Sequence, residues 1–224
     1  MNMHSVVLYG CAAAVVVPGL QLLAALAAEG GPAQVPPPVA LLRAWRRPVP
    51  RVAVVLLAVM VVLGVVQTTV PGTVDALARQ PHGAWWRAGT ALLVQSSGWF
   101  QLLVNLAALA VVAPVAERRF GAWRTVLVLA VSGVTAQAVS MAGWSPRGGG
   151  DSVAICGLVG TLAAWYAVRG SAVALRWAAL AVPAAGLVLC LLANNHGVGL
   201  LVGCALGLVP AARARRLPAA ATPA

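Results

Sequence analysis

Seven long runs of apolar residues constrain the fold of this chain more than any other feature. They cover about residues 6–28, 52–70, 99–116, 125–143, 152–168, 172–193 and 196–212. The runs are apolar on all sides, as lipid-facing or bundle-buried helices are, and none alternates with the two-residue period of a barrel strand. With 61% hydrophobic and 8% charged residues among 224, no single water-soluble core could bury this surface. The sequence therefore predicts an all-α, polytopic membrane helical bundle with seven spans.

Two of these spans are expected to lie inside the bundle. The fifth and seventh runs are the shortest and fall below the roughly 20 residues that cross a bilayer unaided. Neighbouring helices can cover the ends of such short spans.

The arginines predict the orientation, because the chain has no lysine. Twelve of the 15 lie on alternate loops, after the first, third, fifth and seventh runs: Arg43, Arg46, Arg47, Arg51, Arg118, Arg119, Arg124, Arg169, Arg176, Arg213, Arg215 and Arg216. The positive-inside rule assigns these loops to the cytoplasm. We therefore expect a cell-membrane protein with its N-terminus outside and its C-terminus in the cytoplasm. Residues 1–28 are expected to remain as a helix, because no Lys or Arg precedes the first run as in a signal peptide.

The net charge of +11 does not predict nucleic-acid binding. The arginines flank spans, and neither a basic stripe nor an aromatic RNA-binding motif accompanies them. The cysteines fall inside spans without metal-ligand spacing and are expected to be free thiols: Cys11, Cys156, Cys190 and Cys204.

Polar residues gather at the outer ends of the three later spans that enter from outside: Gln101, Asn105, Ser152, Asn194, Asn195 and His196. Polar groups inside a membrane are costly and tend to mark function. Steps of four residues give two faces of small residues, one starting at Ser152 (Cys156, Gly160) and one near His196 (Gly199, Gly203, Gly207). Two close-packing faces of this kind would bring Ser152 and His196 together as nucleophile and base. Gln101 and Asn105, four apart, could donate hydrogen bonds to a developing oxyanion.

Each residue also has a structural interpretation. Judged locally, Ser152 is favoured about two to one as a helix-starting residue, with Asp151 beside it. His196 could simply be packed, Asn105 could bridge helices, and the glycines need only pack. Trp85, Trp86 and Arg87 could form an aromatic belt with a snorkelling arginine.

Three segments, in order, resemble the rhomboid family of intramembrane serine proteases. "AWWRAGTALLVQSSGWFQLLVNLAALAVVAPVAERRFG", residues 84–121, is similar to the family's WR-containing loop, second core helix and ERR-G ending. "GDSVAICGLVG", residues 150–160, is similar to the Gly-x-Ser-Gly segment, and "NHGVGLLVGCALG", residues 195–207, to the last core helix with its histidine.

This resemblance implies a six-helix core over residues 51–212. An extra N-terminal transmembrane helix (1–28), a cytoplasmic Pro/Arg-rich linker (29–50) and a short basic, Pro/Ala-containing tail (213–224) would surround it. It also implies that Ser152 is the nucleophile and His196 its base, with Asn105 and Gln101 stabilising the oxyanion and no metal or cofactor. The partners would be transmembrane protein substrates within the lipid bilayer.

Three positions depart from the family pattern: Gln101 replaces a histidine, Val153 a glycine, and Cys156 an aromatic residue. We expect the bulk of Val153 to hinder the substrate carbonyl, so that Val153→Gly raises cleavage. The same departures support an alternative, a weak or inactive relative that binds transmembrane helices without cutting them. A transporter or channel ranks last, because neither mid-span ionisable residues nor inverted repeats are apparent.

Overall fold

The computed structural model describes residues 3–29, 36–46 and 48–216. Seven helical segments in this part are long and apolar enough to cross a membrane, which confirms the predicted number of spans. The long helices are α1 (Met3–Ala28), α3 (Arg51–Thr69), α6 (Trp99–Phe120), α7 (Ala122–Val139), α8 (Ser152–Arg169), α10 (Ala181–Leu191) and α11 (Asn195–Arg216). The short ones are α2 (Pro37–Arg43), α4 (Thr73–Leu77), α5 (Arg87–Thr90) and α9 (Val173–Ala179), with a 3₁₀ turn at Ala91–Leu93 and a π turn at Ser140–Trp144.

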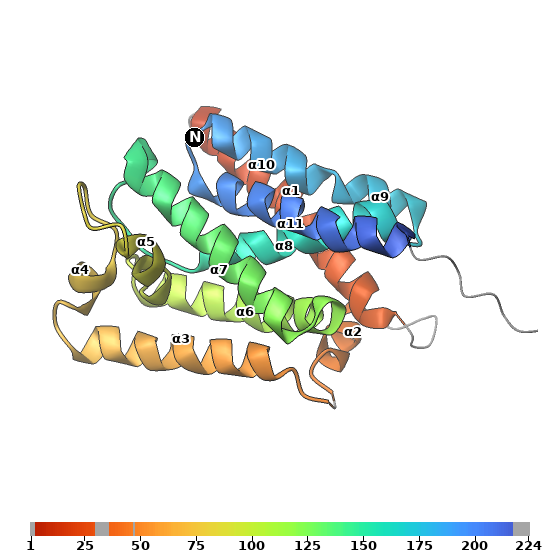
Figure 1. Ribbon diagram of the computed structural model, residues 1–224, viewed down its shortest axis with the longest axis horizontal. Coiled ribbons are helices and arrows are strands. Elements are labelled where there is room, and N and C mark those ends of the chain that lie inside the picture. The colour runs from red at the N-terminus through yellow and green to blue at the C-terminus, as the bar shows by residue number, and fades with distance from the viewer. Residues whose placement is uncertain (1–2, 30–35, 47, 217–224) are drawn as a thin grey trace, which may run out of the picture.

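The long helices lie side by side in one bundle (Figure 1). Helices α4 and α5 lie at one end, which we call the α5 end, and α2 lies at the other, the α2 end. The N-terminus of α1 is at the α5 end. Among the described residues, the only regular pairing that is not helical is an isolated antiparallel bridge between Arg79 and Gly148.

Helix α8 is the most buried of the seven spans, as predicted for the fifth run, and it packs most closely against α11. Three glycines of α11 face backbone carbonyls of α8: Gly199 faces Val153, Gly203 faces Gly157, and Gly207 faces Thr161. A Cβ atom at any of these glycines would lie 1.9–2.3 Å from the carbonyl oxygen. Only glycine permits this approach, and the two backbones are therefore in direct contact.

The predicted α11 stripe is confirmed, and the predicted face of α8 is part of the contact. Ser152 lies against His196, and Gly160 meets the α11 backbone at Leu200. The three glycines of α11 meet α8 one residue further along, at Val153, Gly157 and Thr161. The Thr161 hydroxyl also donates to the Gly203 carbonyl at 2.8 Å, which fastens the two helices.

The sixth predicted span, 172–193, is not one continuous helix. It divides at Leu180 into α9 and α10. Pro183, third in α10, has no N–H for the carbonyl of Ala179, and its ring would clash with that carbonyl in a continuous helix. The break is a consequence of this proline.

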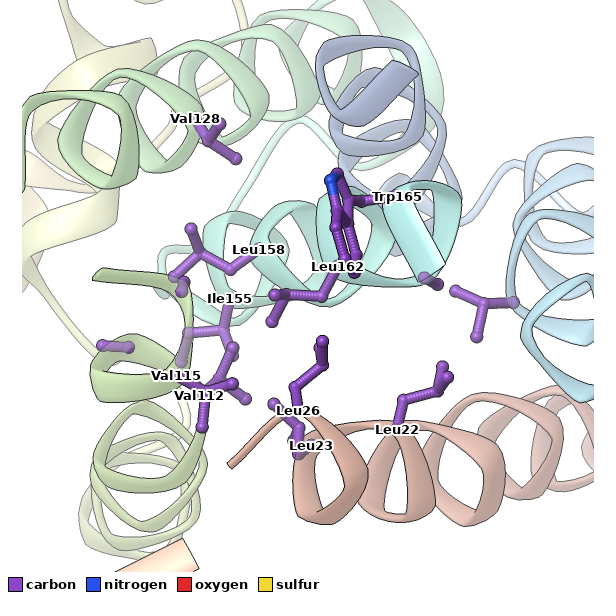
Figure 2. Packing of buried hydrophobic residues seen from close by; sticks show 14 of the residues in the cluster. Leu22, Leu23, Leu26, Val112, Val115, Val128, Ile155, Leu158, Leu162 and Trp165 are labelled. Carbon is purple, nitrogen blue, oxygen red and sulfur yellow. The ribbon is translucent and has the colours of Figure 1, made fainter. Parts of the chain in front are cut away.

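Helix α1 packs along the bundle against α2, α6, α8, α9 and α10. Its half toward the α2 end carries Leu22, Leu23 and Leu26, which point into the main hydrophobic cluster. Figure 2 shows them opposite Leu162 and Ile155 of α8. The added N-terminal helix is thus an integral part of the bundle at its α2 end.

The end of α6 fastens three neighbouring segments. Glu117 accepts the backbone N–H of Ala53 at 2.9 Å and so caps the start of α3. Arg118 donates to the carbonyls of Ala44, Arg46 and Pro48, which anchors the region after α2. Arg119 forms a 3.0 Å ion pair with Glu29 after α1 and lies over the ring of Trp165.

The segment 29–50, predicted as a linker, contains helix α2. Residues 30–35 and 47 of that segment, and 217–224 of the predicted tail, lie outside the described residues.

Candidate active site

Ser152 and His196 lie in hydrogen-bonding contact at the α5 end of the bundle. Ser152 is the first residue of α8 and His196 the second of α11. The Ser152 Oγ is 3.0 Å from His196 Nε2, although 44 residues separate the two in the chain. The contact between the α8 and α11 backbones sets this distance, because it begins one residue after Ser152, at Val153.

Asn194 holds the other side of the imidazole. Its Oδ1 lies 2.8 Å from His196 Nδ1 and also accepts the backbone N–H of His196 at 3.0 Å. An amide oxygen only accepts hydrogen bonds, so Nδ1 must carry the proton. The lone pair of Nε2 then faces Ser152, which is the tautomer a general base needs.

Asn194 is one of the polar residues at the outer end of its span, and its role at the imidazole was not predicted from the sequence. A side-chain oxygen that accepts an N–H in the first turn of the following helix is the usual N-cap arrangement, for which asparagine is favoured. The preceding residue, Ala193, has a left-handed backbone with φ of 53°, which starts the turn into α11. An N-cap asparagine two residues before a candidate histidine was the available signal.

Three buried side chains form a polar cluster at the glycine-rich loop, residues 145–151. We call Gln95, Asn105 and Asp151 the amide–carboxylate cluster. Asp151 Oδ1 accepts from Gln95 Nε2 at 2.9 Å and from Asn105 Nδ2 at 2.8 Å. Asn105 Nδ2 also donates to Gln95 Oε1 at 2.8 Å. All three side chains are at most 5% exposed. The cluster fixes Asp151, and with it the start of α8 at Ser152.

Burial raises the pKa of the Asp151 carboxyl above its ordinary value. The hydrogen bonds from Gln95 and Asn105 favour the ionised form and offset part of that rise. Asp151 also contributes its backbone carbonyl, which accepts the N–H groups of Ala154 and Ile155. These contacts explain why a carboxyl group precedes an apolar helix here.

The side-chain amides of the two predicted oxyanion donors, Asn105 and Gln101, form hydrogen bonds with groups other than Ser152. Both amide hydrogens of Asn105 are engaged within the amide–carboxylate cluster. Gln101 Nε2 donates to the carbonyl of Gly149 at 3.0 Å, and its Oε1 accepts the N–H of Ser97 at 2.8 Å. Both residues therefore border the loop that leads into Ser152, with their amide groups bound to it or to the cluster.

Arg79 fastens the same loop from the other side, a role that sequence analysis did not assign. Its backbone pairs with Gly148, and its guanidinium donates to the Arg147 carbonyl and to Gln137. Gln137 in turn donates to the Gly150 carbonyl at 2.8 Å. Burial lowers the pKa of the Arg79 guanidinium, which is 7% exposed. The signal in the sequence was an arginine outside the alternate basic loops.

Arg87, left open as a snorkelling residue, ties together the region before α6. Its Nη1 donates to the carbonyls of Asp75 at 2.9 Å and Ala78 at 2.7 Å. Its guanidinium also stacks over Trp86 at 4.9 Å from the ring centroid. Arg87 thus joins α5 to α4.

Val153 does not lie over the serine, contrary to the expectation that its bulk hinders the substrate. Its side chain is 2% exposed and packs in a small cluster with Leu92, Ala136 and Ala154. A valine follows Ser152 because this position fills a core between α8 and α7, and glycine there would leave a void.

Among the described residues, no group of three His, Cys, Asp or Glu side chains could hold a metal ion. The four cysteines are free thiols there, as expected.

A family model described as the Rhomboid domain matches residues 82–213, more than half of the chain. The matched range includes α5 to α10 and most of α11, and leaves α1 to α4 outside. No curated protein matches the chain.

Proposed function

The chain belongs to the rhomboid family, and from this premise we propose that it is an intramembrane serine endopeptidase that cuts transmembrane segments of other membrane proteins. The observation that carries the proposal is the 3.0 Å contact between Ser152 Oγ and His196 Nε2, with Asn194 bound to the opposite ring nitrogen. In this proposal residues 51–212 form the six-helix core, and α1 precedes it as an added span. The family includes proteases and inactive relatives, so the site has to support the activity.

The reaction begins with Ser152 attacking the carbonyl carbon of the scissile peptide bond. His196 Nε2 takes the hydroxyl proton as the Oγ–C bond forms. Asn194 keeps Nδ1 protonated throughout, and its oxygen stabilises the imidazolium. The tetrahedral intermediate collapses as His196 gives the proton to the leaving amine. This amine is the new N-terminus of the C-terminal fragment, which departs. Water, deprotonated by His196, then hydrolyses the acyl-enzyme ester and restores the serine.

The oxyanion of the intermediate needs hydrogen-bond donors, and we assign Asn105 and Gln101 to this role. Asn105 has to exchange one of its two present acceptors for the oxyanion, whereas Gln101 uses one amide hydrogen for Gly149 and has a second to donate. The N–H groups of Ser152 and Val153, the first two of α8, are further donors in this proposal, since the first N–H groups of a helix have no carbonyl partner within it. Those of Ala154 and Ile155 are bound to the Asp151 carbonyl.

The alternative is a rhomboid-family protein that binds transmembrane helices without cutting them. One observation favours it: the amide hydrogens of Asn105 are committed to Gln95 and Asp151. If they never leave these acceptors, the serine lacks one source of transition-state stabilisation. The two functions differ in whether Ser152 reacts.

The chain is a multi-pass membrane protein. We further propose that it resides in the cell membrane with its N-terminus outside and its C-terminus in the cytoplasm, as the arginine distribution favours. Ser152 and His196 would then lie near the outer face, where water can reach them under the glycine-rich loop.

The deciding experiment treats detergent-purified protein with a fluorophosphonate probe and, separately, with a panel of transmembrane-segment substrates. Labelling and cleavage are expected in the parent and in Ser145→Ala, an exposed serine of the neighbouring loop. Both should be lost in Ser152→Ala and in His196→Ala. An unlabelled parent that still binds the substrates would establish the alternative, and cleavage by Ser152→Ala would exclude Ser152 as the nucleophile.

A further inference from the structure

Two apolar cavities of about 350 Å³ each lie between α1 and the rest of the bundle. The first, which we call the histidine cavity, reaches the candidate site, because His196 and Asn194 line it together with Cys156. The second lies further along α1, toward α6. Val15, Val16 and Cys156 line both cavities, so the two adjoin at these residues.

Helix α1 is packed unevenly beside these cavities. Leu22, Leu23 and Leu26 are at most 8% exposed, and the ion pair of Glu29 with Arg119 follows directly after the helix. Toward the α5 end, Tyr9 is 68% and Val16 54% exposed. The half of α1 that carries these leucines and precedes the ion pair therefore lies away from the serine, and the histidine cavity lies along the other half.

The chemistry of the histidine cavity indicates what fits it. The remaining lining comes from α1 (Leu8, Tyr9, Cys11, Ala12, Val15 and Val16), from α10 (Leu189) and from α11 (Leu200). No charged side chain lines the cavity, and its only polar lining besides the Tyr9 hydroxyl and the thiols is the imidazole and amide of the site. A volume of this size lies at the low end of the roughly 300–1,000 Å³ typical of ligand pockets.

We propose that the histidine cavity is a substrate subsite that takes a large apolar side chain next to the scissile bond, with α1 as its outer wall. The inference rests on the proposed endopeptidase function. It follows from continuity: His196 lines the cavity, and in the proposed reaction its imidazole exchanges protons with the scissile bond, so a substrate side chain next to that bond would lie at the cavity. Helix α1 lies outside the residues matched by the family model, so this wall is a feature of the present chain.

Cys156 has a specific part in this subsite. It stands one turn after Ser152 on α8 and borders both cavities. A larger side chain at this position would fill the space beside His196 and close the junction of the cavities. The small cysteine is therefore what leaves room for the substrate.

The test uses two neighbouring alanines of α1 with similar exposure. Ala12 lines the histidine cavity, whereas Ala13 is exposed and does not. Leucine is well accepted in helices, so neither Ala12→Leu nor Ala13→Leu should disturb α1 itself. We expect Ala12→Leu to lower kcat/KM about tenfold for substrates with Leu or Phe beside the scissile bond and much less for those with Ala, since a few methylenes in an apolar pocket give this degree of discrimination. Ala13→Leu should match the parent.

The reciprocal variant, Leu8→Ala, enlarges the cavity and should shift preference toward Phe and Trp substrates. Ser152 of Ala13→Leu should react with the small fluorophosphonate probe at the parent rate, because Ala13 does not line the cavity. A parent that the probe does not label contradicts the proposed function itself. A labelled parent in which Ala12→Leu and Ala13→Leu behave alike overturns the subsite, as would a cavity filled by lipid alone.

Discussion

The Oδ1 of Asn194 accepts two hydrogen bonds from the same residue, one from the backbone N–H of His196 and one from its ring Nδ1. One atom thus starts the last helix and orients the candidate general base. The two roles can be separated by substitution, because the backbone bond needs only a short acceptor and the ring bond needs one of asparagine's reach.

We predict that Asn194→Ser retains thermal stability but loses roughly ten- to a hundredfold in kcat. Serine can cap the helix, but its shorter side chain does not reach the imidazole. Losing one hydrogen bond to a buried group costs about 1–3 kcal/mol, and every 1.36 kcal/mol in the barrier is tenfold in rate. KM should stay near the parent value. The measurements are steady-state cleavage, the rate of Ser152 labelling and thermal unfolding.

Asn194→Asp and Asn194→Ala complete this series. Asp keeps an acceptor of the same length and should restore most of the rate lost in Asn194→Ser. Ala removes both bonds and should lose stability as well as rate. If Asn194→Ser cleaves like the parent, Asn194 caps the helix and does nothing for His196.

The second prediction concerns the buried carboxyl of Asp151. Its pKa is raised by burial, so the folded protein holds this proton more tightly than the unfolded chain does. The resulting stability is fully present at pH below the ordinary carboxyl pKa of about 4. It is lost as pH rises through the raised pKa. Asp151→Asn keeps an acceptor oxygen and does not titrate.

The melting temperature of Asp151→Asn should therefore increase relative to the parent between about pH 4 and pH 8, measured in the same detergent. Asp75→Asn, on the exposed helix α4, is the matched control and should follow the parent. A difference between Asp151→Asn and parent that does not vary with pH would contradict this explanation.

The third prediction replaces the one that the sequence suggested for Val153. Because its side chain fills the cluster with Leu92, Val153→Gly should destabilise the protein without raising cleavage. Removing a buried aliphatic side chain costs about 1–3 kcal/mol. Val104→Gly, on an exposed face of α6, separates this cost from the effect of glycine on a helix. Faster cleavage by Val153→Gly would restore the earlier interpretation.

The fourth prediction tests the orientation with introduced cysteines, each compared with the parent and its four native thiols. Ser145→Cys, in the loop before α8, should react with a membrane-impermeant maleimide in intact cells. Trp123→Cys, at the start of α7, should react only after the cells are permeabilised. Both positions are exposed, so accessibility in the folded protein does not bias the comparison. The reverse pattern would place the serine and histidine near the cytoplasmic face.

The spans were predictable because hydrophobicity alone determines which segments enter a bilayer, and α11 was predictable because its glycines repeat every four residues. Ser152 and His196 could be paired from their shared depth on inward-running spans. The partners of Asp151 could not, because Gln95 and Asn105 lie 56 and 46 residues away and hydrogen bonding between distant segments leaves no periodic signal. The α8 residues that face the α11 glycines, each one position further along than the predicted face, could not be predicted, because backbone carbonyls make these contacts and every residue has one.

The contact between α8 and α11 also bears on the order in which the protein becomes functional during synthesis. The ribosome delivers the chain from the N-terminus, so α8 enters the membrane with Ser152 in place while residues 195–216 are still to be made. The carbonyls of Val153, Gly157 and Thr161 have their glycine partners only when α11 arrives. His196 comes with that helix, so the contact between Ser152 and His196 is completed last. A nascent or truncated chain that ends before α11 carries the serine without its proposed base.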